Sequence, residues 1–394
     1  MNDNQITDLV DGENGINQVD SELEVHMQSN YEFQYNEVTG RLFWRPLSAG
    51  ELKELTEYDL NTIIRLCKKN RINCVKSELI QLLMSDFTPR YNPFYAYLES
   101  LPKWDSETDY INKMADTVTT TNQEHWRKCF KKWVVAMVGS LKDENTVNQT
   151  APILSGGQGL GKTTWIGNLV PPELKAYFYS GTINSGSKDS ITQLSECILI
   201  DMDELENLGK KSIGDLKSQM TRKDIRIRRP YGKVAENLPR RASFIGSINQ
   251  KEFLKDETGS RRFLCFEIKN ISNDAEFKID NLYAQALSLF DSGFQFWFDG
   301  LEIQEVQLSN QQFHALSIES ELLIKHFEPA TADTATHFLS ATEIAHILND
   351  REKMAVNNST LQHLGKALAA KKFENLSRNN RKVWAVRDKL KLAA

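Results

Sequence analysis

The stretch SGGQGLGKTTW, residues 155–165, follows a short apolar segment and precedes a segment with helical pattern. Gly156, Gly161, Lys162 and Thr163 have the spacing G-x-x-x-x-G-K-[ST] of a phosphate-binding loop. Glycines allow successive backbone N–H groups to converge on an anion, because no Cβ blocks positive φ or close approach. The order strand, loop and helix therefore predicts a nucleotide-binding α/β fold. The alternative, a glycine-rich turn before a helix, is disfavoured.

The loop also predicts which cofactors bind. Lys162 is expected to reach the outer phosphates, and the hydroxyl of Thr163 is expected to ligate Mg²⁺. We therefore expect ATP and Mg²⁺ as cofactors. The expected ATP-binding residues are Gly156, Gly157, Gln158, Gly159, Leu160, Gly161, Lys162, Thr163 and Thr164.

Composition indicates an ordinary water-exposed protein. Of 394 residues, 40% are hydrophobic and 26% are charged, which is typical of globular domains. No apolar run approaches the roughly 20 residues that span a bilayer, so no membrane partner is expected. The five cysteines are scattered and odd in number, which favours reduced thiols in the cytoplasm and gives no zinc-site spacing.

Charge is distributed unevenly along the chain. The net charge is −5, and residues 1–30 hold seven acidic residues without any Lys or Arg. Much of the basic charge lies in 222–241 and 366–391. This segregation favours a nucleic-acid partner more than the net charge does.

A second apolar run, CILIDMDEL at 197–205, ends in acids and is expected to form the strand beside the phosphate-loop strand. Asp201 or Asp203 would then hold Mg²⁺, and Glu204 is the candidate that polarises the attacking water. The alternative is a buried strand whose acids mark its solvated end. The acids of DMDE can be aligned with the expected roles in two registers, so which acid has which role is left open.

Two further stretches carry candidate catalytic residues. FIGSINQ at 244–250 is an apolar strand ending in Asn249, which either contacts the γ-phosphate or its water, or begins a turn. DETGSRRF at 256–263 places Arg261 and Arg262 after a turn. These arginines are either the surface of a strand or fingers that reach a neighbouring subunit's nucleotide.

The segment KDIRIRRPYGKVAENLPRR, residues 223–241, predicts a basic β-hairpin. Alternation places Ile225 and Ile227 on one side and the arginines on the other, and the Pro-Tyr-Gly turn follows. Such a hairpin would bind phosphates and stack its tyrosine on a base, unless it is a solvated hairpin without ligand. The expected DNA contacts are Arg226, Arg228, Arg229, Tyr231 and Lys233.

The C-terminal region predicts a second basic surface. NNSTLQHLGKALAAKKF at 357–373 resembles the recognition helix of a winged helix, with ENLSRNNRKVWAVR at 374–387 as the wing. Its alternative is a structural or protein-binding module. The residues expected to face phosphates are Lys371, Lys372 and Arg381, with Lys366, Arg378 and Lys382 beside them.

The remaining pattern gives the organisation. A hairpin is predicted over 31–46, helices over 55–69 and 77–86, and a core-packing helix that opens with a capping box at Thr121. The predicted domains are an acidic flexible tail at 1–30, an N-terminal hairpin with a helical region at 31–148, an ATPase core at 149–300, a helical connector at 301–334 and a winged-helix-like basic domain at 335–394.

Five motifs in this order and spacing resemble the virulence-associated protein E family: SGGQGLGKTTW, ILIDMDEL, DIRIRRPYGK, FIGSIN and DETGSRRF. YNPFYAYLESLPKWD at 91–105 matches the family's lead-in, and the resemblance covers roughly 90–270. Proteins of that family come from prophages and mobile elements, and their core is similar to superfamily-three replicative helicases. One departure is Asp201, where many relatives are expected to carry Glu.

The resemblance implies an AAA+-like P-loop core with a mainly parallel sheet, a helical N-terminal region and a C-terminal winged helix. It implies a ring, expected to be a hexamer, that hydrolyses ATP and translocates on single-stranded DNA. Duplex DNA and replication or primase proteins are further expected partners. The alternatives are a nucleotide-dependent DNA-binding switch or scaffold without unwinding, and a small-molecule kinase, which Asn249 and the paired arginines disfavour.

Overall fold

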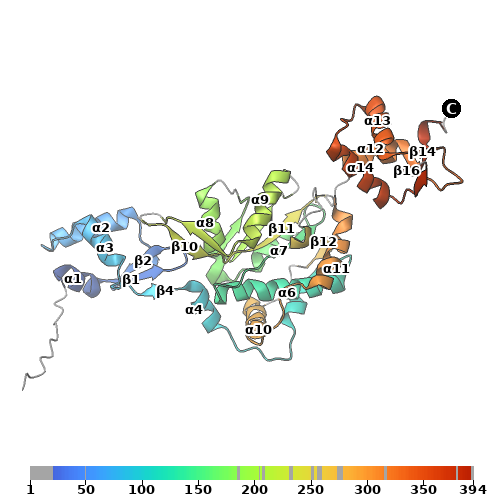
Figure 1. The fold of residues 1–394 in the computed structure, drawn as a ribbon. Helices are drawn as coiled ribbons and strands as arrows, with labels where there is room; N and C mark the ends of the chain where they lie inside the picture. Colours follow the sequence, from blue (N-terminus) through green and yellow to red (C-terminus); the bar gives the residue numbers. More distant parts are fainter. Residues whose placement is uncertain are drawn as a thin grey trace, which may run out of the picture. The chain divides into compact units, whose positions relative to one another are not determined.

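The computed structural model describes residues 21–48, 50–183, 187–203, 205, 209–229, 234–249, 253–254, 260–272, 278–314, 317–378 and 380–391. These residues form two compact units. The first holds the chain up to Ser100 together with Arg229, and the second holds the rest. The predicted mixed α/β architecture is confirmed (Figure 1). The five-part division expected from the sequence is finer and stays a prediction.

The first unit is built on a four-stranded sheet with the order β3-β2-β1-β4. The predicted hairpin and the two predicted helices are confirmed, since Tyr31 pairs with Pro46 and Asn36 with Arg41 across the hairpin. The elements are α1 (Glu22–Asn30), β1 (Tyr31–Asn36), β2 (Arg41–Pro46), β3 (Lys53–Glu54), α2 (Glu57–Lys69), α3 (Lys76–Leu83), β4 (Arg90–Tyr91) and α4 (Pro93–Ser100).

Helix α1 corrects one expectation, because its residues were predicted to belong to a flexible acidic tail. Ser21 and Glu24 form a capping box, in which each side chain accepts from the other's backbone N–H. Leu23 and Met27 are four residues apart and both are buried. The acidic charge of the segment concealed this short apolar pair. Residues 1–20 of the predicted tail lie outside the described residues.

The second unit contains a six-stranded sheet with the order β5-β12-β6-β11-β8-β7. All neighbouring pairs are parallel except β5 with β12. Strand β8 was expected beside the phosphate-loop strand β6, and this is wrong because β11 lies between them. The strands are β5 (Val118–Thr120), β6 (Ala151–Ser155), β7 (Phe178–Ser180), β8 (Leu199–Asp203), β11 (Ser243–Ile248) and β12 (Phe263–Ile271).

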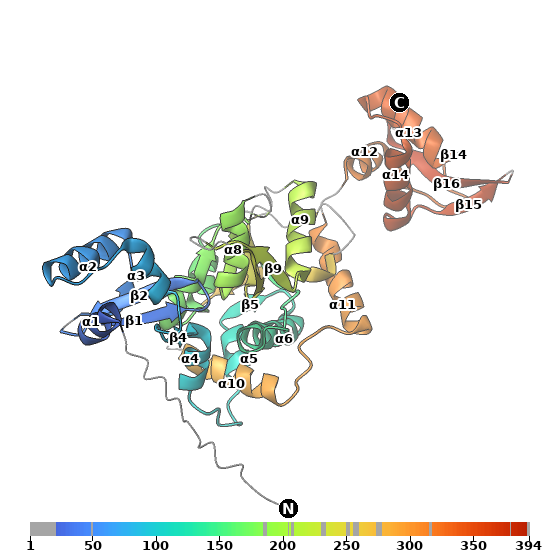
Figure 2. The same ribbon diagram turned by 60° about the vertical axis from the view of Figure 1, so that its left-hand side comes forward.

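Helices cover both faces of this sheet, which explains why β6 and β11 are buried along their whole length. Figure 2 shows α8 and α9 on one side and α5, α6 and α10 on the other. These helices are α5 (Tyr110–Ala115), α6 (Gln123–Lys142), α7 (Lys162–Asn168), α8 (Lys188–Glu196), α9 (Lys210–Thr221), α10 (Ile279–Asp291) and α11 (Gly300–Asn310).

Helix α6 is the central core helix, as predicted. Trp126, Phe130 and Trp133 are fully buried, and the indole N–H of Trp133 donates to the carbonyl of Phe244 in β11 at 3.1 Å. The prediction that Thr121 caps this helix is wrong. Asn122 is the N-cap instead, because the backbone N–H of Thr121 is already paired with the β12 carbonyl of Glu267.

Residues 317–391 fold around a core of their own. The helix predicted over 357–373 is confirmed, and the two strands that follow it form a hairpin in which Arg378 pairs with Arg381. Within the described part of the chain, every helix is too short or too polar to span a bilayer. The elements are α12 (Ile318–His326), β13 (Phe327–Pro329), β14 (His337–Leu339), α13 (Ala341–Glu352), α14 (Asn358–Ala370), β15 (Asn375–Arg378) and β16 (Arg381–Asp388).

Strands β9 (Asp224–Ile227) and β10 (Glu236–Pro239) form the predicted antiparallel hairpin. Arg240 directly follows β10 and is 1% exposed. Among the described residues, its guanidinium donates only to backbone carbonyls, and burial lowers its pKa to about 9. The acceptors are the carbonyls of Arg222, Ala242, Asn148 and Met220.

Replacing this guanidinium by an apolar side chain is expected to destabilise the second unit. Arg240→Met would leave four carbonyls without this donor, three of them in buried hydrogen bonds, and each unsatisfied buried group costs about 1–3 kcal/mol. We expect the free energy of unfolding in urea to fall by at least about 3 kcal/mol. Arg226→Met, at an exposed position on β9, is the control and should change it by less than about 0.5 kcal/mol. Equal stability of both variants would contradict a structural role for Arg240.

Candidate nucleotide-binding site

The loop after β6 is shaped by two glycines. The backbone N–H of Gly156 donates to the carbonyl of Ile248 at 3.1 Å, which fastens the start of the loop to β11. A Cβ on Gly156 would lie 3.2 Å from the carbonyl of Ile268, so a side chain does not fit there without displacement. Gly161 has φ +80° and is the N-cap of α7, a conformation that favours glycine. The loop therefore needs glycine at Gly156 because neighbouring strands approach it closely, and at Gly161 because of its positive φ.

Lys162 is the first residue of α7, and its side chain is 7% exposed. Its amine donates to the carbonyls of Gly156 and Gly157 at 2.6 and 2.9 Å. It also donates to Oδ1 of Asn249 at 3.4 Å, just after the end of β11. The structure thus brings together the predicted lysine and the predicted asparagine, which are 87 residues apart.

Of the remaining predicted loop residues, Gly157, Gln158 and Gly159 are exposed and Leu160 is half-buried. Thr163 and Thr164 are exposed in the first turn of α7. Trp165 is buried on the opposite side of the helix, and its indole N–H donates to the hydroxyl of Thr117 at 2.7 Å. This anchor sets the direction of α7 at the end of the loop.

Asp201 and Asp203 lie on β8, two residues apart and therefore on the same face of the strand. Asp201 is fully buried, and its Oδ1 has no hydrogen-bond partner among the described residues. Its Oδ2 accepts from the Ser180 hydroxyl at 3.5 Å, and Oδ1 of Asp203 accepts from Ser247 at 3.3 Å. Burial, reinforced by the negative charge of Asp203, raises the pKa of Asp201 to about 7.

The arginine pair lies in a short 3-10 helix, η3 (Ser260–Arg262), before β12. Arg261 is exposed and Arg262 is half-buried. Burial and the neighbouring Arg261 lower the pKa of Arg262. Sequence reasoning missed the residue that holds this turn: the buried amide of Asn310 donates to the carbonyls of Ser260 and Phe263 at 3.0 and 2.8 Å.

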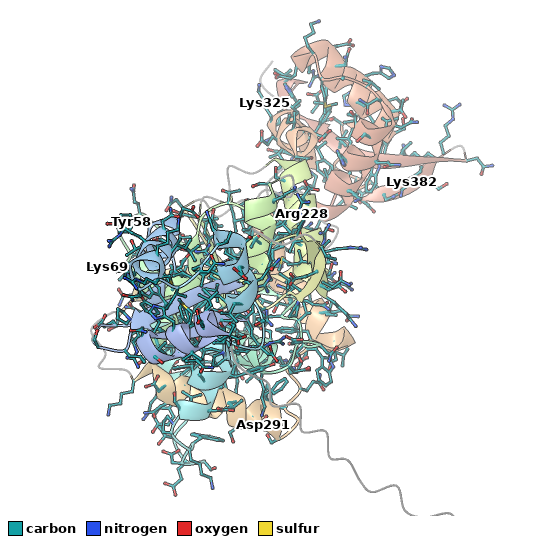
Figure 3. The ribbon with its side chains drawn as sticks, turned by 90° about the vertical axis from the view of Figure 1, so that its left-hand side faces the viewer. Tyr58, Lys69, Arg228, Asp291, Lys325 and Lys382 are labelled. Carbon is teal, nitrogen blue, oxygen red and sulfur yellow. The ribbon has the colours of Figure 1, made fainter. Side chains whose placement is uncertain are left out.

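The candidate DNA-binding residues on the β9–β10 hairpin have different environments. Arg226 and Arg228 are exposed, whereas Ile225 packs into the core, as the predicted alternation requires. Figure 3 labels Arg228. Arg229 donates to the carbonyl of Glu37 at 2.9 Å within the first unit. The other expected residues of this group and the proposed water-polarising acid lie outside the described residues: Tyr231, Lys233 and Glu204.

In the C-terminal module, Lys372 and Arg381 are exposed and Lys371 is half-buried. Two neighbouring cations are held over aromatic rings. The Arg378 guanidinium lies 3.3 Å from the centre of the Phe338 ring, and the Lys382 amine lies 5.2 Å from that of Trp384. Figure 3 labels Lys382 on the hairpin, which thus has a basic exposed surface supported by rings.

A comparison with protein-family models identifies the class. The model of the virulence-associated protein E-like domain matches residues 98–315. The match covers more than half of the chain, so this protein belongs to the virulence-associated protein E-like domain family. The resemblance expected from the motifs is confirmed at this level.

The apo structure of the C-terminal region of NrS-1 aligns with a TM-score of 0.49 at 12% identity, covering 93% of this chain and 98% of that chain. An A-form apo structure of the same region aligns with a TM-score of 0.45 at 13% identity and the same coverage. No curated protein sequence matches this chain.

The buried carboxylate of Asp201 predicts a pH dependence of stability. Because its pKa is raised from 3.8 to about 7, the folded state holds a proton that the unfolded chain releases. The stabilisation is present at low pH and is lost as pH rises through about 7. Without added metal or nucleotide, the unfolding free energy of the parent should fall relative to Asp201→Asn by up to about 1.4 kcal/mol per pH unit between pH 5 and 7.

The control is Asp203→Asn, which removes the neighbouring charge and should move the midpoint of this dependence to lower pH. Urea unfolding across a pH series measures both effects. Parallel curves for the parent and Asp201→Asn would contradict a raised pKa.

Proposed function

We propose that this protein is an ATP-dependent DNA helicase or replication ATPase of mobile-element type, which hydrolyses ATP in a ring and translocates on single-stranded DNA. One observation carries the proposal. The Lys162 amine, the Asn249 amide group and the acids of β8 gather at the carboxyl ends of adjacent parallel strands, beside a glycine loop. In open α/β sheets this edge is where ligands bind.

The lysine contacts support phosphate binding. Its amine donates to loop carbonyls of Gly156 and Gly157, which are weaker acceptors than phosphate oxygens. Binding of the β- and γ-phosphates would exchange these acceptors, while the link to Asn249 keeps the amine at the end of β11. Asn249 would then orient the attacking water.

The residues present fit a divalent cation. The buried Oδ1 of Asp201 has no hydrogen-bond partner among the described residues, and a cation supplies such an oxygen with its missing interaction. Asp201, Asp203 and the exposed hydroxyl of Thr163 would hold Mg²⁺ directly or through its waters. When bound, Mg²⁺ neutralises charge that develops on the phosphates. Glu204 is proposed to take the proton of the attacking water.

The arginine pair supports action between subunits. Asn310 fixes the turn that carries Arg261 and Arg262, so their guanidinium groups leave the core at a defined point. In a closed ring, head-to-tail contacts bring such a surface to the neighbour's nucleotide. We propose that one of the two neutralises transition-state charge there.

The DNA contacts are proposed on two surfaces. Arg226 and Arg228 on the β9–β10 hairpin would hold the phosphates of the translocating strand. The C-terminal module is proposed to be a winged helix that docks on duplex DNA. In its hairpin Arg378 lies directly opposite Arg381, a like-charge pair that is unfavourable without an anion.

Removing the lysine amine tests the nucleotide site. Lys162→Ala should abolish ATP binding and turnover, because the loop loses the amine that is proposed to contact the phosphates. Asn249→Ala should keep binding but lower turnover about 100-fold, since it removes a group proposed to act on the water. Steady-state ATPase assays and binding of a labelled ATP analogue measure the two effects.

Lys103→Ala, at an exposed lysine outside the candidate site, is the control and should leave turnover within twofold of the parent. Unwinding is measured on the same variants with a forked substrate. An ATPase that depends on Lys162 but never displaces a strand would refute the helicase and leave a DNA-binding switch.

Action in trans predicts complementation in mixed rings. An Arg262→Ala subunit keeps its own loop, and a Lys162→Ala subunit keeps its arginines. Mixing the two variants in equal proportions should restore up to about a quarter of the parent ATPase activity. Of the four possible ordered pairs of neighbouring subunits, one combines an intact lysine with an intact arginine from the neighbour. Mass photometry verifies that the mixed oligomers form. Absence of rescue in verified mixed oligomers would place the arginines in their own subunit's site or in folding.

A further inference from the structure

Helix α2 of the first unit has one exposed face with unusual composition. Its buried side carries Ile63 and Cys67, which are fully enclosed. On the opposite side Tyr58, Arg65 and Lys69 follow the spacing i, i+7 and i+11, so they lie along one stripe. Tyr58 is 81% exposed, and Figure 3 shows Tyr58 and Lys69 at the surface of this unit.

The charges of this unit divide into two groups. Residues 21–100 contain nine Lys and Arg. Five of them pair with acids, and the other four make no ion pair with the part of the chain that the structure describes. The five pairs are Arg41–Glu54, Arg45–Glu32, Lys53–Asp59, Lys76–Glu57 and Arg90–Glu37. The other four follow one another among the cations of this unit, at the C-terminal end of α2 and in the turn after it: Arg65, Lys68, Lys69 and Arg71.

This grouping has an energetic cost inside the protein. Arg65 and Lys69 are one helical turn apart, and like charges at this spacing destabilise a helix by a few tenths of a kcal/mol. The acids of α2 do not compensate, because Glu57 is paired with Lys76 and Asp59 is buried. The helix dipole favours cations in the last turn, but it does not account for an exposed tyrosine in the first.

The turn after α2 adds the fourth cation. Arg71 has a left-handed backbone with φ 60°, and its N–H donates to the carbonyl of Lys68 at 3.1 Å. This turn holds an exposed arginine next to the last exposed lysines of the helix. The surface formed by Tyr58, Arg65, Lys68, Lys69 and Arg71 is called the α2 face.

We propose that the α2 face binds single-stranded nucleic acid. Its cations would contact phosphates, and a base would stack on the ring of Tyr58, the combination that sequence-tolerant single-strand sites use. The helix rises about 16 Å between Tyr58 and Lys69, enough for a few nucleotides of an extended strand. This site goes beyond the proposed motor, because it lies in the first unit and needs neither the nucleotide loop nor hydrolysis.

Photocross-linking of the full chain locates the contact. A short single strand carrying 5-iodouracil should cross-link to Tyr58, as mapped by mass spectrometry. Arg65→Gln/Lys69→Gln should abolish this cross-link, because the strand loses its phosphate contacts. Lys103→Gln/Lys278→Gln removes two exposed cations elsewhere and should leave it unchanged.

Affinity measurements give a second readout. By fluorescence anisotropy, Tyr58→Ala should weaken single-strand binding at least fivefold, and Tyr58→Phe should retain it because the stacking ring remains. Arg65→Gln/Lys69→Gln should reduce the slope of log affinity against log salt by about 1.4, or 0.7 for each contact. Circular dichroism verifies that the variants are folded.

Three results would overturn the proposal: no cross-link at Tyr58, an unchanged salt slope in Arg65→Gln/Lys69→Gln, or an equal loss of affinity for duplex DNA. The same measurements in a Lys162→Ala background separate this site from the proposed motor. If mutation of the α2 face still weakens single-strand binding in the Lys162→Ala background, the site is supported even if the parent protein shows no ATPase activity.

Discussion

The end of β11 is held against the glycine loop after β6, and the candidate site depends on this contact. The N–H of Gly156 donates to the carbonyl of Ile248, and the amine of Lys162 reaches Asn249 one residue further on. Because β11 also pairs with β8, the same strand sets the position of Asp203 through Ser247. Three segments that are distant in sequence are therefore aligned by one central strand, which has helices packed on both faces.

Features with a local pattern were predictable from the sequence. The spacing of Gly156, Gly161 and Lys162 gave the strand, loop and helix, because each position needs a particular backbone conformation or charge. Alternation around Ile225 predicted the hairpin, and the aromatic spacing of α6 predicted a core helix. Such patterns depend on neighbours within a few residues, so they are legible without the fold.

Features that depend on distant partners were not predictable. The position of β11 between β6 and β8 is a choice among strand orders that share the same local pattern. The burial of Arg240 within a basic stretch, and the role of Asn310 at the arginine turn, require carbonyls from other elements. In α1 the apolar pair was too short to outweigh the acidic composition around it.

The buried Arg240 has a mechanical consequence. Its guanidinium connects the foot of the β9–β10 hairpin to the carbonyl of Asn148, three residues before β6 begins, and to that of Ala242, directly before β11. A force applied to the hairpin is thus transmitted to the two strands that carry the loop and Asn249, rather than absorbed by bending at its base. Displacement of the hairpin base would therefore stretch hydrogen bonds that end directly before β11 and three residues before β6.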